Sequence, residues 1–189
     1  MGAVHFSPMA NALPWGAPLT EDDLAPMPED GHRYELLDGA LLVTPSPNIA
    51  HQNCVTNLVG LLLGARTGGY TVLVAPFDVR LSRLTVLQPD VLVFPTGEST
   101  PDRLERTPLL VVEVLSPSTR RIDLGAKRLA YQDAGVPAYW LVDPNRPGLT
   151  ALHLEQGRYV EHAVVTGDEP YEATFPFPVT VVPSALVAG

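Results

Sequence analysis

Two acidic residues lie in segments that are otherwise typical of buried β-strands. Asp90 is the charged residue of VLQPDVLVF, and Glu113 interrupts the apolar run of TPLLVVEVLSPST. An ionised carboxylate in such surroundings costs several kcal/mol unless a counter-charge pairs with it. Each acid therefore requires a partner, and the chemistry of that partner decides what the site can do.

The two acids are expected to meet. Side chains alternate across a strand, so Asp90 shares a face with Leu92, and Glu113 shares a face with Val111. If the strands are neighbours, both carboxylates can point the same way. Because two unneutralised carboxylates repel, either one of them holds a proton or a cation lies between them. A hard divalent ion such as Mg²⁺ suits one or two carboxylates, a backbone carbonyl and water.

A third acid, Asp78, belongs to the preceding predicted strand. A turn at SRLT would bring it roughly opposite Pro89 or Asp90. We therefore expect Asp78 to add an oxygen ligand to this metal site.

Lys127 follows on a predicted helix, and it is the one lysine among 12 cationic residues. Asp123, Lys127 and Tyr131 are spaced at i, i+4 and i+8, which places them on one helical face. Beside the strand acids, Lys127 could orient or deprotonate an attacking water and stabilise charge on a phosphate. The alternative is an exposed Asp–Lys pair worth about 0.2–0.5 kcal/mol. The use of lysine favours a functional role, because burial can move the pKa of an ammonium.

Composition limits the classes of protein to consider. With 189 residues, 46% of them hydrophobic, the chain is expected to form a single globular domain. Its single cysteine, Cys54, fits a reducing compartment, and neither a signal peptide nor a membrane-spanning segment is evident, so we expect a cytoplasmic protein. The net charge of −9 opposes nucleic-acid binding unless basic residues cluster or metal ions offset it.

The predicted elements form an α/β core with β additions at both ends. Residues 1–18 are interpreted as a flexible arm, and a short turn capped by Thr20 follows. A hairpin turns at Asp38-Gly39, and a helix covers SPNIAHQNCVTNLVGLLLGARTGG. Strands then precede a second helix, which starts near Ser116 or Ser118 and stops at Gly135. The core is expected over residues 33–145, with a hairpin and a final strand over 149–183.

The strings PDVLVF and VVEVLSPSTRRIDLGAKRLAYQDAGVPAYWLVDP, preceded by YELLDGALLVTPSPNIAH, resemble the Uma-type family of restriction-endonuclease-like proteins. This family is a branch of the PD-(D/E)XK nuclease superfamily. The resemblance covers roughly residues 33–145, and its motifs are specific in combination. It implies a restriction-endonuclease-like core, in which helices flank a mixed β-sheet.

The resemblance also implies a metal-dependent phosphodiesterase site. Asp90 stands at the Asp of the PD element, Glu113 at the acid of the third element, and the Val114 carbonyl would be a further metal ligand. Leu115 occupies the position where the parent superfamily has its lysine. The Uma-type pattern resembles one in which this lysine has moved to the following helix. At that position this sequence has Lys127.

Weaker candidates have ordinary structural explanations beside the functional ones. Glu35 matches an acid common in the family, but a solvent-facing strand position is at least as consistent with the sequence. His51, on the apolar side of its helix, is interpreted first as a hydrogen-bonded core histidine, and Tyr131 as a core aromatic residue. Arg120 and Arg121 could meet a phosphate backbone, although paired surface arginines are common.

The sequence therefore predicts a Mg²⁺- or Mn²⁺-dependent nuclease that hydrolyses phosphodiester bonds of nucleic acid, with DNA as the expected substrate. By analogy, a homodimer is expected, because two sites are suited to cutting two strands. The alternative is a non-catalytic interaction module that retains the nuclease fold. The missing E-x-K lysine and the acidic balance favour this alternative.

Overall fold

The computed structural model of the chain describes residues 16–97, 103–104 and 106–188. Most of the predicted arm, residues 1–15, lies outside this range. The short turn η1 (Glu21–Asp23) is capped as predicted, since Thr20 N donates to Asp23 Oδ2 at 2.7 Å. No helix formed by the described residues is both long and apolar enough to cross a bilayer.

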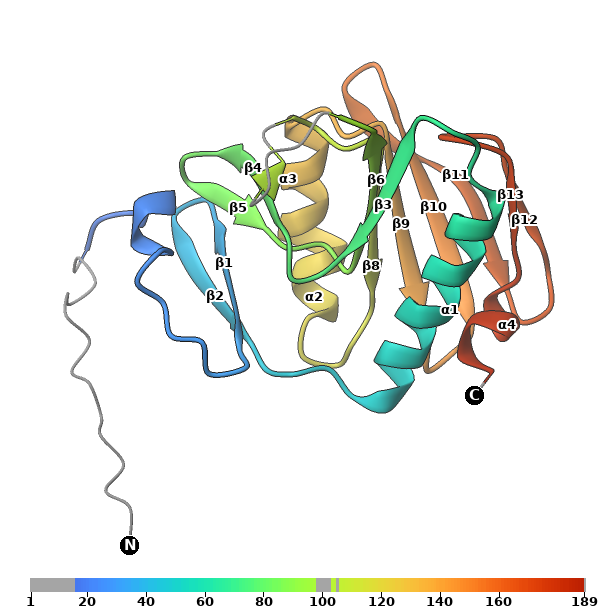
Figure 1. Cartoon of the computed structure of the whole chain (residues 1–189), viewed down its shortest axis with the longest axis horizontal. Coiled ribbons are helices and arrows are strands. Elements are labelled where there is room, and N and C mark those ends of the chain that lie inside the picture. The colour runs from blue at the N-terminus through green and yellow to red at the C-terminus, as the bar shows by residue number, and fades with distance from the viewer. Residues whose placement is uncertain (1–15, 98–102, 105, 189) are drawn as a thin grey trace, which may run out of the picture.

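A mixed sheet of six strands, in the order β11-β10-β9-β8-β6-β3, is the largest sheet of the described chain (Figure 1). Only β8 and β9 pair in parallel within this sheet, and the helical segment between them makes the crossover. The strands are β3 (Tyr70–Val74), β6 (Val91–Pro95), β8 (Leu110–Val114), β9 (Ala138–Asp143), β10 (Gly148–Glu155) and β11 (Arg158–Thr166).

A second sheet has the order β2-β1-β5-β4-β7 and carries the amino-terminal hairpin. Asp38 and Gly39 form its turn, as predicted, with φ of 52° and 77°. These positive values suit the two central residues of a type I′ turn. The strands are β1 (Arg33–Leu37), β2 (Ala40–Thr44), β4 (Asp78–Ser82), β5 (Thr85–Leu87) and β7 (Arg103–Leu104).

Helix α1 (Ile49–Ala65) lies on one face of the six-stranded sheet (Figure 1). Asn48 caps its start by accepting a hydrogen bond from His51 N at 2.9 Å. Its buried residues Cys54, Leu58 and Leu62 belong to the core that includes Trp140 of β9. This packing confirms the helix predicted from the apolar spacing.

The opposite face is covered by a helical segment that combines α2 (Arg120–Ile122), the π-helical turn η2 (Asp123–Lys127) and α3 (Arg128–Asp133). Tyr131 packs there against Tyr139 of β9, with ring centroids 5.2 Å apart. The prediction of a helix after Ser118 is confirmed, but its middle is a wider turn than the α-helix expected. Such π-turns are rare in proteins, and those that occur often lie at functional sites.

The carboxyl-terminal part differs from the prediction of one hairpin followed by a final strand. The hairpin of β10 and β11 is present, but a second small sheet and a short helix follow it. These are β12 (Tyr171–Ala173), β13 (Val179–Val181) and α4 (Pro183–Val187). Tyr171 and Val181 join the core beneath α1, which explains why this end of the chain folds back onto the sheet.

Candidate active site

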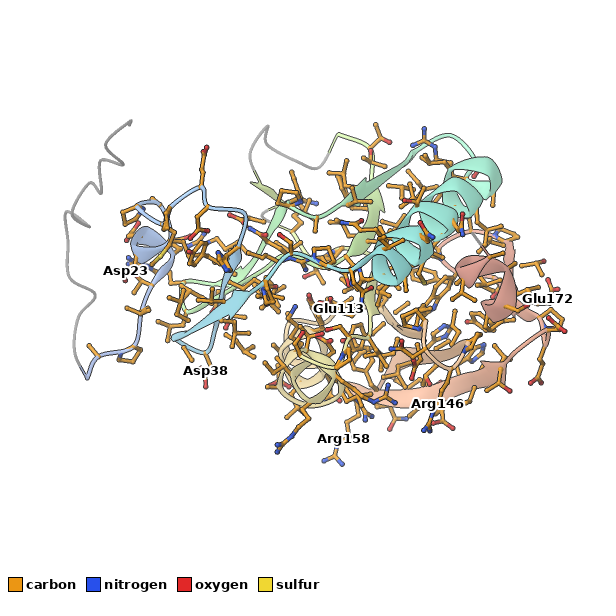
Figure 2. All side chains as sticks on the ribbon, turned by 90° about the horizontal axis from the view of Figure 1, so that it is seen from below. Asp23, Asp38, Glu113, Arg146, Arg158 and Glu172 are labelled. Carbon is orange, nitrogen blue, oxygen red and sulfur yellow. The ribbon has the colours of Figure 1, made fainter. Side chains whose placement is uncertain are left out.

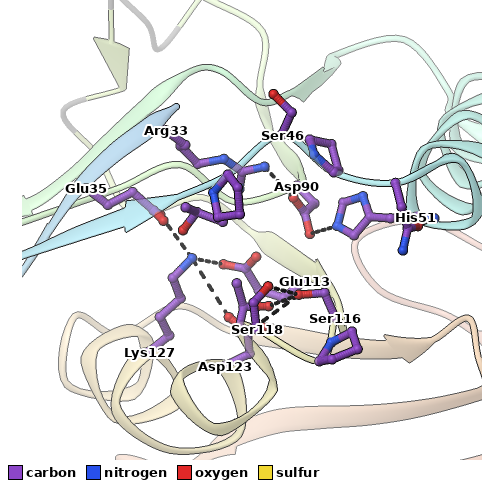
Figure 3. Close-up of a pocket in the computed structure, with 16 residues that line it drawn as sticks. Arg33, Glu35, Ser46, His51, Asp90, Glu113, Ser116, Ser118, Asp123 and Lys127 are labelled. Atoms are coloured by element: carbon purple, nitrogen blue, oxygen red, sulfur yellow. Dashed lines mark hydrogen bonds and ion pairs between the residues drawn. The ribbon is translucent and has the colours of Figure 1, made fainter. Parts of the chain in front are cut away.

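Asp90 and Glu113 line the same cavity, which has a volume of about 230 Å³ (Figure 3). Strands β6 and β8 are antiparallel neighbours with Val91 opposite Val112, so extending this register by one residue sets Asp90 opposite Glu113. The expectation that both carboxylates share one face is confirmed. Both are almost fully buried, with exposed fractions of 4% and 2%. In the view of Figure 2, Glu113 lies between α1 and the helical segment that follows β8.

Asp90 is bound through both of its carboxylate oxygens. Oδ1 accepts a hydrogen bond from Arg33 Nη2 at 3.0 Å, and Oδ2 accepts one from Val114 N at 2.9 Å. His51 Nε2 lies 3.0 Å from Oδ2. Burial alone would raise the pKa of Asp90, but His51 and the charge of Arg33 together bring it below its usual value. Asp90 is therefore ionised at neutral pH.

Glu113 is bound through Oε1. Lys127 Nζ lies 3.0 Å from this oxygen, and the Tyr131 hydroxyl donates to it at 3.0 Å. Burial raises the pKa of Glu113 well above its usual value, and Lys127 offsets this only in part. Glu113 therefore holds a proton more readily than an ordinary carboxyl group does.

Lys127 is surrounded by three carboxylates. Besides Glu113, Glu35 Oε1 lies 2.9 Å and Asp123 Oδ1 lies 3.9 Å from its Nζ. Burial opposes the charge of this ammonium, but the three acids outweigh burial and raise the pKa of Lys127. With 3% of the residue exposed, the interpretation of an exposed Asp–Lys pair is wrong. The ammonium keeps its proton, which argues against a role in deprotonating water.

The π-helical turn η2 supplies the cavity with the side chains of Asp123 and Lys127. Asp123 begins the turn, Lys127 ends it, and both are buried there, whereas Leu124 between them is 42% exposed. The Tyr139 hydroxyl donates to Asp123 O at 3.0 Å and so ties the turn to β9. The predicted shared face of Asp123, Lys127 and Tyr131 is present, and the π-helical turn forms its first part.

Two further predicted residues also line the cavity. Glu35 is 1% exposed, so the solvent-facing position considered for it is wrong. Its Oε1 accepts a hydrogen bond from Gln88 N at 2.7 Å and contacts Lys127. His51 is a buried, hydrogen-bonded histidine, as its first interpretation holds, and its partner is the cavity residue Asp90.

Arg33 is a cavity residue that the sequence interpretation missed, and Gln88 is a neighbour that holds it. Arg33 Nη1 donates to Gln88 O at 2.8 Å, and Gln88 Nε2 donates to Asp78 Oδ1 at 2.7 Å. The available signal was spacing: Arg33 precedes Glu35 by two positions on β1, which places both on one face of that strand. Arg33 is the arginine that neutralises Asp90.

Five predicted residues do not line the cavity. Val114 and Tyr131 still bind its acids, because Val114 N donates to Asp90 and the Tyr131 hydroxyl donates to Glu113. The other three do not. Asp78 is bound by Gln88 instead of facing Asp90, because the β4–β5 register sets Val79 opposite Leu87 and shifts between Arg80 and Ser82. The expected third carboxylate from β4 is therefore not found at the site. Arg120 and Arg121 are exposed at the start of the helical segment, and Arg120 Nη1 contacts Asp143 Oδ2 at 2.6 Å.

The family model described as "Putative restriction endonuclease", Uma2, matches residues 21–182. The chain belongs to the Uma2 family. Among solved structures, the crystal structure of a "putative nuclease" from Anabaena variabilis is similar, with a TM-score of 0.69 and 18% identity over 90% of this chain and 98% of that chain. At this identity the likeness shows the fold alone, which is the restriction-endonuclease-like α/β fold predicted. No curated protein matches the chain.

In this Uma2 protein, acids outnumber cations in the cavity. Four carboxylates line it against the two permanent cations Arg33 and Lys127, which gives a formal excess of two negative charges when every carboxylate is ionised and histidine is counted as neutral. Burial raises the pKa of Asp123 to about 6, with Lys127 opposing the shift. The four carboxylates are Glu35, Asp90, Glu113 and Asp123.

The donor types of the Uma2 cavity fit the divalent ion that the resemblance implies. Asp90 and Glu113 offer carboxylate oxygens, and carboxyl groups outnumber the permanent cations of the cavity. In addition, Asp123 Oδ1 is buried without a hydrogen-bond donor. Over the described ranges, however, no group of three or more His, Cys, Asp or Glu side chains is placed to hold an ion. A metal here would therefore rely on two carboxylates, a backbone carbonyl such as that of Val114, and water.

Proposed function

We propose that the protein is a Mg²⁺- or Mn²⁺-dependent nuclease that hydrolyses phosphodiester bonds of nucleic acid, with DNA as the substrate. The observation that carries this proposal is that four carboxyl groups face only two permanent cations in a cavity lined by Asp90 and Glu113. Such a cavity repels a phosphodiester unless a cation compensates it. A bound divalent ion would supply this compensation and would ease proton loss from the attacking water.

The residues of the chain have separate parts in this reaction. Asp90 and Glu113 hold the ion, and the Val114 carbonyl completes the protein ligands. Hydrolysis forms a bond from the water oxygen to phosphorus and breaks the bond from phosphorus to the leaving oxygen. The proton lost by the attacking water passes to solvent, and solvent returns one proton to the leaving oxygen. Lys127 is charged, so it orients the water and stabilises negative charge on the phosphate.

The test is cleavage of DNA by the purified protein with Mg²⁺ or Mn²⁺ and with a chelator. The variants Asp90→Asn, Glu113→Gln and Lys127→Met are expected to lose cleavage, by about 10²-fold or more. Glu172→Gln is a matched control, because Glu172 is an exposed acid that accepts a hydrogen bond from Thr180 at 2.7 Å, away from the cavity. Equal cleavage by all of these proteins would mean that the cavity is not the active site.

A specific observation favours a second candidate, a non-catalytic interaction module. Arg33 already neutralises Asp90 and Lys127 already contacts Glu113, so neither acid is without a cation in the protein itself. Calorimetric titration with Mn²⁺ separates the two functions. Binding that disappears in Asp90→Asn supports the nuclease, whereas the absence of binding to the unaltered protein supports the module.

We further propose a cytoplasmic homodimer. The basis is the single buried cysteine, Cys54, which fits a reducing compartment, and the analogy that two sites suit cleavage of two strands. Light scattering of the purified protein tests the dimer, because a mass near 20.3 kDa would identify a monomer.

A further inference from the structure

Arg33 divides its guanidinium between a fixed backbone atom and a carboxylate of the site. Nη1 donates to Gln88 O at 2.8 Å. Nη2 donates to Asp90 Oδ1 at 3.0 Å (Figure 3). The Arg33 side chain is 17% exposed, whereas that of Asp90 is 5% exposed. Arg33 also lines an adjoining cavity of about 250 Å³, so it lies between the site and a neighbouring depression.

A divalent ion at Asp90 would compete with Arg33. The guanidinium occupies the oxygen Oδ1, while Oδ2 already accepts hydrogen bonds and contacts His51. Two cations that share one carboxylate repel each other at such short range. Ion binding therefore weakens the Arg33–Asp90 pair, and the guanidinium needs another anionic partner.

We propose that Arg33 exchanges partners: it neutralises Asp90 in the metal-free protein and binds a phosphate of the nucleic acid once a divalent ion occupies Asp90. This inference rests on the proposed function. Its consequence is that metal and nucleic acid bind with positive coupling. The metal takes the place of Arg33 at Asp90, and the phosphate takes the place of Asp90 at Arg33, so each ligand favours binding of the other. The metal-free site is correspondingly held in a form that binds nucleic acid poorly.

The geometry of Arg33 suits this exchange. Guanidinium has five N–H donors in a planar fork that matches phosphate oxygens, and the two contacts described use two of them. The hydrogen bond to Gln88 O does not depend on the charge of Asp90. It can therefore act as a pivot at Nη1 about which the whole guanidinium turns away from Asp90. Gln88 is itself fixed, because its N donates to Glu35 Oε1 and its Nε2 donates to Asp78 Oδ1.

The first measurement is the affinity for Mn²⁺ by titration calorimetry. Arg33→Gln removes the competing cation and is expected to bind Mn²⁺ about fivefold more tightly or better. Arg80→Gln is the matched control, because Arg80 pairs with Glu21 (Nη2 to Oε1, 2.8 Å) and does not line the cavity. Its affinity for Mn²⁺ is expected to equal that of the unaltered protein, and thermal melting checks that both variants fold.

The second measurement is the anisotropy of a fluorescent 20-base-pair DNA duplex with EDTA and with Ca²⁺, a hard cation that takes the same oxygen ligands. In the unaltered protein and in Arg80→Gln, Ca²⁺ is expected to strengthen DNA binding about tenfold or more. In Arg33→Gln this gain is expected to disappear. If Arg33 only neutralised Asp90, its removal would also raise the affinity for Mn²⁺. In that case Arg33→Gln would still bind DNA more tightly with Ca²⁺ than with EDTA.

The outcomes distinguish this inference from the function on which it rests. If Asp90→Asn binds Mn²⁺ as tightly as the unaltered protein, the metal site itself is wrong. If Asp90→Asn loses Mn²⁺ but Arg33→Gln binds it no more tightly, or retains the gain from Ca²⁺, the metal site stands and the exchange of Arg33 is overturned.

Discussion

Lys127 lies on the helical segment that follows β8, and its Nζ is 3.0 Å from Oε1 of Glu113 inside the protein. The same nitrogen is 2.9 Å from Oε1 of Glu35 on β1, which belongs to the other sheet. One ammonium therefore joins an acid of each sheet to the helical segment. It counters the charge of the site and also contributes to the packing of the sheets.

Lys127→Met is expected to destabilise the protein by about 3–5 kcal/mol, because it leaves buried carboxylates without their counter-charge. The loss should depend on pH. Burial raises the folded-state pKa of Glu113 above its usual 4.5, and without Lys127 it rises further. A group with a raised folded pKa contributes stability below its unfolded pKa and loses it as pH rises, so the deficit is larger at pH 8 than at pH 5.

Urea unfolding of the unaltered protein and of Lys127→Met at both pH values measures this difference. The double variant Glu113→Gln/Lys127→Met provides the control, since removal of the acid should restore part of the stability lost. A deficit that does not change with pH would contradict the assignment of Lys127 as the counter-charge of buried acids.

Tyr131→Phe is expected to cost about 1–3 kcal/mol of stability, because it removes a buried hydrogen bond to Glu113 Oε1. It should also reduce metal-dependent cleavage, since Glu113 loses one of the groups that fix its orientation. Tyr159→Phe is the matched control: its hydroxyl donates to Val136 O at 2.9 Å, outside the cavity, so it should lose stability but keep cleavage. Equal cleavage by the two variants would separate Tyr131 from the site.

Cys54 is expected to be inert toward thiol reagents in the folded protein. Burial, with a smaller contribution from the charge of Asp90, raises the pKa of this thiol to about 12 from a usual value of 9.0. Since the thiolate is the reactive form, reaction with a disulfide reagent at pH 8 should be undetectable without denaturant. Complete labelling should follow in urea, and rapid labelling of the native protein would show that the α1 face opens.

Arg121→Gln is expected to weaken DNA binding to a similar degree across sequences if this exposed residue contacts the phosphate backbone. The affinity should then depend less on salt, with the slope of log affinity against log salt concentration smaller by about 1. Arg158→Gln is the control, because Arg158 is exposed on β11, where Figure 2 shows its side chain pointing outward. An unchanged salt slope would remove Arg121 from the nucleic-acid surface.

The sequence predicts those parts of the site that depend on local periodicity. Alternation along two strands places Asp90 and Glu113 on one face, and helical spacing places Lys127 near Tyr131. These predictions succeed because each depends only on the direction of side chains within one element. The position of Lys127 also depends on a π-turn, which the residue pattern of the sequence does not predict.

Features that depend on how separate elements meet were not predictable. The counter-charge of Asp90 comes from Arg33, 57 positions earlier in the chain, and nothing near either residue specifies this contact. Asp78 was misplaced because an irregularity between Arg80 and Ser82 changes the register of β4 and β5. The two-stranded sheet of β12 and β13 was missed because its strands are only three residues long.

The contact between Lys127 and Glu35 has a consequence for how this protein can change. A ligand that attracts the Lys127 ammonium also weakens its contact with Glu35 on β1. The affinity for that ligand and the stability of the contact between the sheets therefore depend on the same ammonium group. In the proposed nuclease, substitutions that strengthen the contact between Lys127 and Glu35 should raise stability and slow cleavage. Substitutions that weaken this contact should have the opposite effects.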